Sequence, residues 1–397
     1  MPSSLAAATG AEAEVLLDLF VVLLATMVGA AVFRRLGQPR IIGQVVAGMI
    51  VGPSVLGVVG PNEVLRVFAE LGVVFILFWV GLETRLSHVW AVARPATAVG
   101  TLGIALPFAA GAAAADALGM DAATSVFVGA ALVATSTGIT SAVLLELRAL
   151  HLRVGRTIVA AAVVDDILAM IILSVATGIA AGGSLEFTTL LVTLLLASGF
   201  VAFFALGGTA FVRRRPHLLV APSFAESPTL PIVIACLGLA AFAAELGLAA
   251  IVGAFLAGLI VAETREQFAV EKEVAPLYAF FPPFFFGGIG IEVELGALAD
   301  AGAIGLLALV TAIAVVTKLV GAYIGALPLG RREALFVGVA MIPRGEVGII
   351  VASIGSSAGV IDEEIFAIIV CMSLVTTLLA PPLLRALMRS GEHAWAA

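Results

Sequence analysis

Long apolar runs make up most of this sequence, and each is near the roughly 20 residues that a helix needs to cross a lipid bilayer. Because lipid offers the backbone no hydrogen-bond partners, such runs must fold as helices that satisfy their own amide and carbonyl groups. The sequence therefore predicts an all-α polytopic membrane protein with about 13 transmembrane helices. These are expected at residues 15–33, 41–60, 64–82, 95–115, 123–145, 155–181, 187–211, 229–244, 247–262, 276–295, 300–327, 333–359 and 363–388.

The composition excludes the main alternatives to a membrane protein. Hydrophobic residues make up 62% of the chain and charged residues only 12%, whereas soluble domains are about one quarter charged. Disordered chains carry more charge and fewer large apolar residues. The sequence has no basic patch that could bind nucleic acid. Cys236 and Cys371 both lie in apolar runs, which is not typical of a disulfide framework or a zinc site, and we expect no cofactor.

The positions of lysine and arginine predict how the chain is oriented, because cytoplasmic connections carry an excess of these residues. Of the 20 in the sequence, 17 fall on alternate connections or at the C-terminal end. Arg66 is the one basic residue on the opposite side, where the connections are acidic. This alternation predicts an odd number of spans, with the N-terminus outside and the C-terminus in the cytoplasm.

Five charged residues remain inside the apolar runs, namely Asp165, Asp166, Lys318, Arg344 and Glu346. Each costs roughly 2.5–3.5 kcal/mol to insert, so an intramembrane charge indicates a functional site by default. The alternative is a buried ion-pair network without a transport role. That alternative stays open for Arg344 and Glu346, each of which could hold backbone groups in place.

The adjacent carboxylates Asp165 and Asp166 lie in the middle of a predicted helix. They repel each other, and one lysine cannot neutralise both, so ion or proton binding explains the pair better than structure alone. Lys318 is the natural partner, because a buried lysine can release its proton at physiological pH whereas an arginine effectively cannot. A fixed counter-charge that never titrates is the alternative role for this lysine.

Two predicted helices carry residues that interrupt a helix at membrane depth. The fifth contains the segment TSTG at residues 135–138, and the twelfth has Pro343 and Gly345 beside its charges. Broken helices expose backbone ends that transporters use to hold ions, and hydroxyl and carbonyl oxygens are ligands for small hard cations. For the fifth helix alone, the alternative is a packing face of small residues.

The two breaks lie seven spans apart, an offset that reverses orientation in the membrane as an inverted repeat requires. Helices 4–6 would then mirror helices 11–13, with the two broken helices crossing near the midplane. The aspartate pair would belong to one repeat and Lys318 to the other. The double proline at Pro282 and Pro283 is expected to kink the tenth helix.

These residues resemble a known family. The motifs GLET (81–84), LVATSTGIT (132–140), AAVVDDILAMI (161–171), LAAIVGAFLAG (248–258), TKLVGA (317–322) and PRGEVGII (343–350) are similar to those of NapA-type bacterial sodium/proton antiporters. These antiporters belong to the monovalent cation/proton antiporter-2 family, which also holds the Kef-type potassium systems. The resemblance extends from residue 38 over nearly the whole chain.

The resemblance implies a homodimer in the bacterial inner (plasma) membrane. Its dimerisation domain would comprise residues 1–92 and 226–297, holding helices 1–3 and 8–10. A core ion-transport domain would comprise residues 93–182 and 298–397, holding helices 4–6 and 11–13. The linker helix 7 would lie within residues 183–225.

The resemblance also assigns roles to single residues. Asp166 would be the main ion-binding carboxylate, and Asp165 would pair with Lys318 when no sodium is bound. Thr135 would complete the sodium ligands with both aspartates. The residues that support the broken helices would be Ser136, Thr137, Gly138, Pro343, Arg344, Gly345 and Glu346.

The implied function is secondary active antiport of Na⁺ or Li⁺ against H⁺ by alternating access, and the aspartate pair implies electrogenic transport. A potassium/proton antiporter of the same family is one alternative. Others are a cation channel or sensor on this fold, and an organic anion transporter. An enzyme is least expected, since the sequence contains neither an HExxH nor a GxSxG motif.

Overall fold

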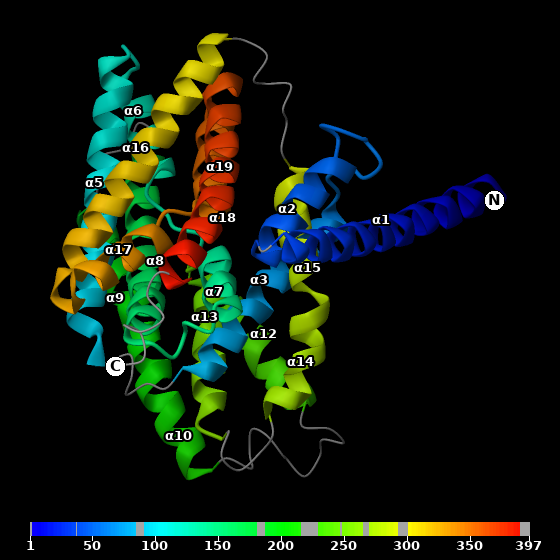
Figure 1. Ribbon diagram of the computed structural model, residues 1–397, viewed down its shortest axis with the longest axis horizontal. Helices are drawn as coiled ribbons and strands as arrows, with labels where there is room; N and C mark the ends of the chain where they lie inside the picture. The colour runs from blue at the N-terminus through cyan, green and yellow to red at the C-terminus, as the bar shows by residue number, and fades with distance from the viewer. Residues whose placement is uncertain are drawn as a thin grey trace. The chain divides into compact units, whose positions relative to one another are not determined.

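The computed structural model describes residues 2–36, 38–84, 91–180, 187–215, 229–246, 248–264, 270–292 and 301–389 (Figure 1). Within these ranges every regular element is a helix and no strand occurs. Among the described residues, seven helices are long and apolar enough to cross a membrane, and the others include shorter apolar ones. The predicted all-α polytopic fold class is confirmed.

Each of the thirteen apolar runs coincides with one helix or with a pair of helical pieces. The single helices are α1 (Pro2–Arg35), α2 (Arg40–Val51), α3 (Glu63–Glu83), α5 (Ala93–Ala117), α8 (Arg153–Ala180), α12 (Thr229–Glu245), α13 (Ala250–Ala262), α16 (Ala301–Ala326) and α19 (Glu363–Arg389). The interrupted ones are α6 (Ala122–Ala131) with α7 (Thr137–Glu146), α14 (Val270–Phe280) with α15 (Pro282–Ile291), and α17 (Arg331–Ala340) with α18 (Glu346–Ser357). A π-helical segment, η1 (Phe203–Gly208), joins α9 (Phe187–Ala202) to α10 (Thr209–Arg214), and the 3₁₀ turn η3 (Leu327–Leu329) follows α16.

Two details of the helix ends follow from proline. The second run was expected to continue to residue 60, but α2 ends at Val51. Gly52 is extended and precedes Pro53, and the residue before a proline is pushed out of the helical region. The kink expected in the tenth helix is confirmed, since α14 ends at Phe280 and Pro282 opens α15.

The chain forms two compact units. One contains residues 1–75 and 276–296, and the other contains residues 76–275 and 297–397. In the first unit, α1 packs on α2, and α15 packs on both. The division into dimerisation, linker and core domains given by the family resemblance stays a prediction.

The second unit contains two series with the same order: a long helix, a broken helix and a long helix. The first series is α5, α6–α7 and α8, and the second is α16, α17–α18 and α19. The two series meet along α5 and α16, which run side by side (Figure 1). Their close approach depends on glycine, since a Cβ on Gly321 would collide with the carbonyl oxygen of Leu102.

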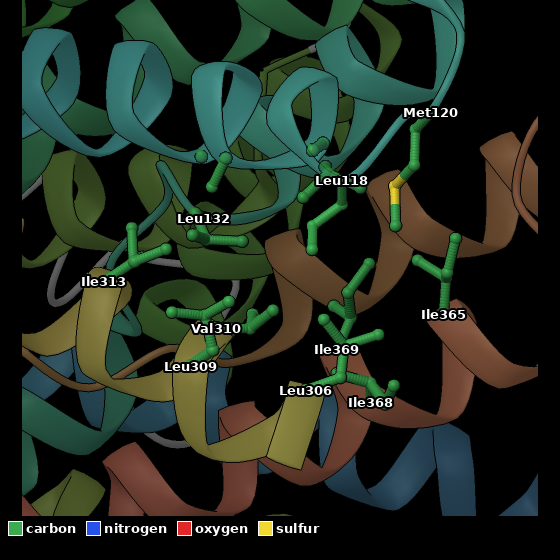
Figure 2. Close-up of a pocket in the computed structure, with 14 residues that line it drawn as sticks. Leu118, Met120, Leu132, Leu306, Leu309, Val310, Ile313, Ile365, Ile368 and Ile369 are labelled. Carbon is green, nitrogen blue, oxygen red and sulfur yellow. The ribbon is translucent and has the colours of Figure 1, made fainter. Parts of the chain in front are cut away.

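An apolar pocket of about 430 Å³ lies among α5, α6, α16 and α19 (Figure 2). Its lining contains only apolar side chains and one glycine, including Leu118, Met120, Leu132, Val310 and Ile369. A pocket without an oxygen-bearing side chain offers little to a cation, so the polar chemistry of this unit lies elsewhere.

Replacing Gly321 by Val tests the contact between the two series. The added side chain would collide with the backbone of α5, and overpacking of this kind costs about 1–3 kcal/mol. We expect a lower melting temperature in detergent. Gly305→Val is the matched control on the same helix, because a Cβ at Gly305 meets nothing within 4 Å. Equal melting temperatures for the two variants would contradict the proposed close contact.

Candidate functional site

The two broken helices of the second unit touch at their interruptions. The amide of Ser136, in the break between α6 and α7, donates a hydrogen bond of 2.8 Å to the carbonyl oxygen of Pro343, in the break between α17 and α18. A Cβ on Gly345 would lie 2.6 Å from Oγ of Ser136, so the approach requires a glycine there. The predicted crossing of two broken helices is therefore present.

The hydroxyl-rich segment satisfies the exposed carbonyl end of α17. Thr140 Oγ1 donates to the carbonyl oxygen of Ala340 at 2.8 Å, and Thr135 Oγ1 donates to that of Met341 at 3.4 Å. All four residues are buried. Since the last carbonyls of a helix have no partner within the helix, these threonines stabilise the break that the sequence predicted. Gly138 is also buried, in the first turn of α7.

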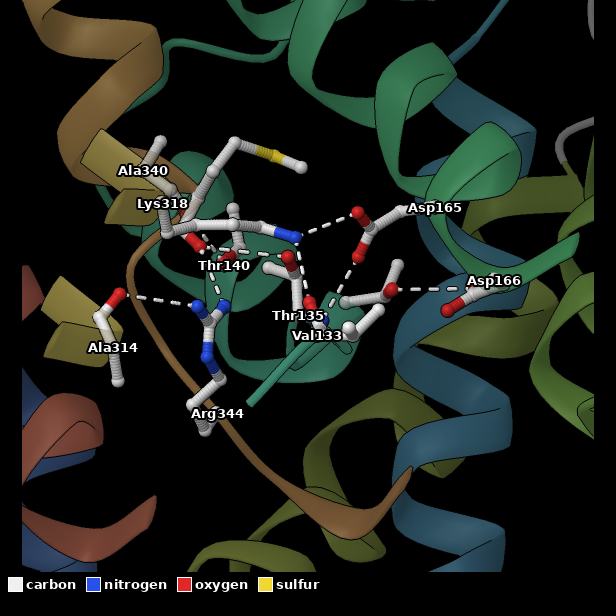
Figure 3. A network of polar contacts seen from close by, with 11 residues as sticks. Val133, Thr135, Thr140, Asp165, Asp166, Ala314, Lys318, Ala340 and Arg344 are labelled. Carbon is white, nitrogen blue, oxygen red and sulfur yellow. Dashed lines mark hydrogen bonds and ion pairs between the residues drawn. The ribbon is translucent and has the colours of Figure 1, made fainter. Parts of the chain in front are cut away.

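A buried ion pair lies next to the crossing (Figure 3). Lys318 Nζ of α16 is 2.7 Å from Asp165 Oδ1 of α8, and both side chains are 0% exposed. The same ammonium donates to the carbonyl oxygen of Val133 at 2.7 Å, and Asp165 Oδ2 accepts the amide of Thr135 at 2.9 Å. The structure thus brings together Asp165, Lys318 and Thr135 from both series.

Asp166 faces a different environment from its neighbour, because consecutive residues of a helix do not share a face. It is 4% exposed, and Thr137 Oγ1 donates to its Oδ2 at 3.4 Å. Asp166 and Thr137 line a small cavity whose other walls are apolar residues of α3, α8 and α13: Leu77, Val159, Val163, Ile251, Val252 and Phe255. The cavity therefore offers a carboxylate and a hydroxyl in apolar surroundings.

The hydroxyl beside Asp166 is thus Thr137, which sequence reasoning had assigned to helix support, whereas the Thr135 hydroxyl binds a carbonyl. Sequence reasoning assigned no site role to Thr140, although it lies among the polar residues that interrupt the fifth helix, and it missed Val133. The hydroxyl of Thr140 was visible in the motif LVATSTGIT, but Val133 takes part through its backbone carbonyl, which side-chain patterns do not reveal.

Arg344 is 0% exposed and lies in the break of the second series. Its guanidinium donates to the carbonyl oxygen of Ala314 at 3.2 Å and to that of Met341 at 3.4 Å. Its backbone is held by two threonines of α19, Thr376 at the amide and Thr377 at the carbonyl. Glu346 opens α18, but its side chain lies outside the described ones.

Replacing Lys318 by Met tests the ion pair. The substitution leaves the Asp165 carboxylate buried without its counter-charge, and breaking a buried pair in this way costs about 3–5 kcal/mol. We expect a large fall in melting temperature in detergent, with partial recovery in the double variant Lys318→Met/Asp165→Asn. Arg66→Met, which removes a largely exposed pair with Glu63, should leave the melting temperature unchanged. A double variant no more stable than the single one would count against the pair.

The sequence of this chain is similar to those of known proteins. The sequence model of the family described as sodium/hydrogen exchanger, transmembrane, matches residues 21–390. The Na⁺/H⁺-K⁺ antiporter GerN of Bacillus cereus is 34% identical over 377 residues, covering 94% of this chain and 96% of GerN. A Na⁺/H⁺ antiporter of Enterococcus hirae is 34% identical over 371 residues, covering 92% of this chain and 96% of that protein.

The fold is also similar to a solved one. The structure of the sodium proton antiporter MjNhaP1 from Methanocaldococcus jannaschii matches with a TM-score of 0.66. The match covers 95% of this chain and 97% of that one at 18% identity. With the family match over almost the whole length, the resemblance drawn from the motifs is confirmed: this chain belongs to the sodium/hydrogen exchanger family of transmembrane proteins.

Proposed function

We propose that this protein is a secondary active sodium/proton antiporter. The observation that carries the proposal is the pair of adjacent carboxylates at the crossing of two broken helices, one of them paired with a buried lysine. The relatives support it, since those of Bacillus cereus and Enterococcus hirae are named as Na⁺/H⁺ antiporters. A transporter with this site exchanges ions and is not an enzyme.

Asp166 is the main ion-binding group of this proposal. Carboxylate and hydroxyl oxygens are hard ligands suited to small cations, and both Asp166 and Thr137 line the same cavity. A carboxylate also binds a proton, so sodium and protons compete for one site, which is the basis of exchange. Asp165 and Thr135 complete the site, as the family resemblance implies.

Lys318 supplies the second proton of the cycle. Without sodium, Asp166 is protonated and the Lys318 ammonium holds Asp165. Sodium arriving from the cytoplasm binds Asp166 and displaces both protons, and the core then moves to open the site to the outside. If two protons enter for each sodium expelled, one net charge moves inward, and a potential of about 100 mV adds about 2.3 kcal/mol to the driving force.

Potassium is a second candidate substrate, because the relative GerN is named a Na⁺/H⁺-K⁺ antiporter. We further propose that the protein is a homodimer in the plasma membrane. Its N-terminus would lie outside and its C-terminus in the cytoplasm. Dissipation of a pH gradient in proteoliposomes, titrated with Na⁺, Li⁺ and K⁺, identifies the transported cation.

Asp166→Asn tests the site. The amide carries no charge and does not take up a proton, so we expect sodium-dependent proton flux in proteoliposomes to be abolished. Glu70→Gln, which changes a largely exposed carboxylate, is the control and should retain wild-type flux. Wild-type flux in Asp166→Asn would refute the site assignment. Continuous single-channel current through the wild type would favour the channel alternative.

Lys318→Gln tests the origin of the second proton. Glutamine can still hydrogen-bond but carries no proton to release, so the charge moved per sodium should fall or electrogenic transport should be lost. The measurement is the sodium-driven current relative to the sodium flux in proteoliposomes at a clamped potential. An unchanged ratio would show that the second proton comes from another group.

A further inference from the structure

Arg344 is a fully buried cation that the exchange cycle above does not use. Its guanidinium reaches backbone carbonyls on two elements of the second unit, at Met341 directly after α17 and at Ala314 within α16. Among the ion pairs between described residues, none includes Arg344. Its charge is therefore directed at helix carbonyls, and one of these lies at the negative end of α17.

The carbonyl of Met341 links the guanidinium to the ion site. It also accepts the hydroxyl of Thr135 at 3.4 Å, and the amide of Thr135 donates to Asp165 Oδ2 at 2.9 Å. The other oxygen of Asp165 is 2.7 Å from Nζ of Lys318. Lys318 lies four residues after Ala314 on α16, one helical turn away. The backbone of α16 therefore connects Lys318 to the carbonyl of Ala314, which the Arg344 guanidinium also holds.

These contacts, drawn as dashed lines in Figure 3, run through both helix breaks and α8, and the backbone of α16 from Ala314 to Lys318 closes them into a ring. The guanidinium suits this place because it is planar and presents several donors in a fixed fork, so it can hold two acceptors at once. A lysine would keep the positive charge but would act as a single point with a flexible stem.

We infer that Arg344 is a positioning residue that sets the affinity of the ion site without touching the ion. By tying the end of α17 to α16, it fixes the carbonyl that orients Thr135, and through Thr135 it fixes Asp165. This inference rests on the proposed antiport function, and it deepens that function by assigning a determinant of cation affinity.

The test compares Arg344→Gln and Arg344→Lys with the wild type in proteoliposomes. Loss of a group that orients a metal ligand typically reduces affinity or activity about 10–100-fold, so we expect a rise of about that size in the half-saturating sodium concentration for Arg344→Gln. The half-saturating sodium concentration of Arg344→Lys should rise less, because an ammonium can still reach one carbonyl. A matched control is Thr317→Val, which removes a hydroxyl-to-carbonyl hydrogen bond to Ile313 within α16, beside Lys318, but lies outside the ring. It should keep the wild-type sodium affinity.

A second measurement needs no transport. Hydrogen exchange at the amide of Thr135 should be faster in Arg344→Gln than in the wild type or Thr317→Val, because the bond from this amide to Asp165 loses its support. A wild type without sodium-dependent proton flux would refute the proposed function, while amide exchange would still test the ring.

The inference is overturned if both sodium affinity and Thr135 exchange are unchanged in Arg344→Gln. It is also overturned if Thr317→Val changes both of them equally. If Arg344→Gln is not recovered in folded form, Arg344→Lys decides with the same two measurements, and wild-type values for it overturn the inference.

Discussion

Burial of the Lys318–Asp165 pair is the constraint on which the rest of the second unit depends. Removing both charges from water costs several kcal/mol per ion, and their attraction offsets this only when the remaining hydrogen-bond positions are filled. Here the carbonyl of Val133 and the amide of Thr135 fill positions on the lysine and the aspartate. Both groups belong to residues 132–136, where the fifth span is not helical, so the ion pair and the broken helix stabilise each other.

At the second broken helix, the exposed backbone carbonyls are satisfied in part by another buried cation, Arg344. The carbonyls of Ala340 and Met341, at the end of α17, accept hydrogen bonds from Thr140, Thr135 and Arg344. One cation therefore serves the break in each series: Lys318 at α6–α7, and Arg344 at α17–α18. Of these two cations, only Lys318 forms an ion pair with a carboxylate among the described side chains. The two cations thus have matching places in the fold but different partners.

Much of this arrangement could be predicted from the sequence, because charges and helix breakers are conspicuous in apolar runs. The cost of an intramembrane charge singled out Asp165, Asp166, Lys318 and Arg344, and glycine, proline and hydroxyl residues located both breaks. The partners of Arg344 could not be predicted, since they are backbone carbonyls. The sequence also could not show that the hydroxyl beside Asp166 belongs to Thr137 and not to Thr135. The direction of each hydroxyl depends on how the unwound segment is bent.

The two carboxylates are consecutive residues of α8, a helix without interruption over its 28 residues. Their backbone positions are fixed relative to each other, whatever the protein does. The groups that face them come from separate pieces of chain: Thr135 and Thr137 at the first break, and Lys318 on α16. The site therefore combines two carboxylates carried by one continuous helix with facing groups carried by two other segments. Under the proposed function, α8 keeps the backbone spacing of the carboxylates the same for every cation, so selectivity would fall to the groups that face them.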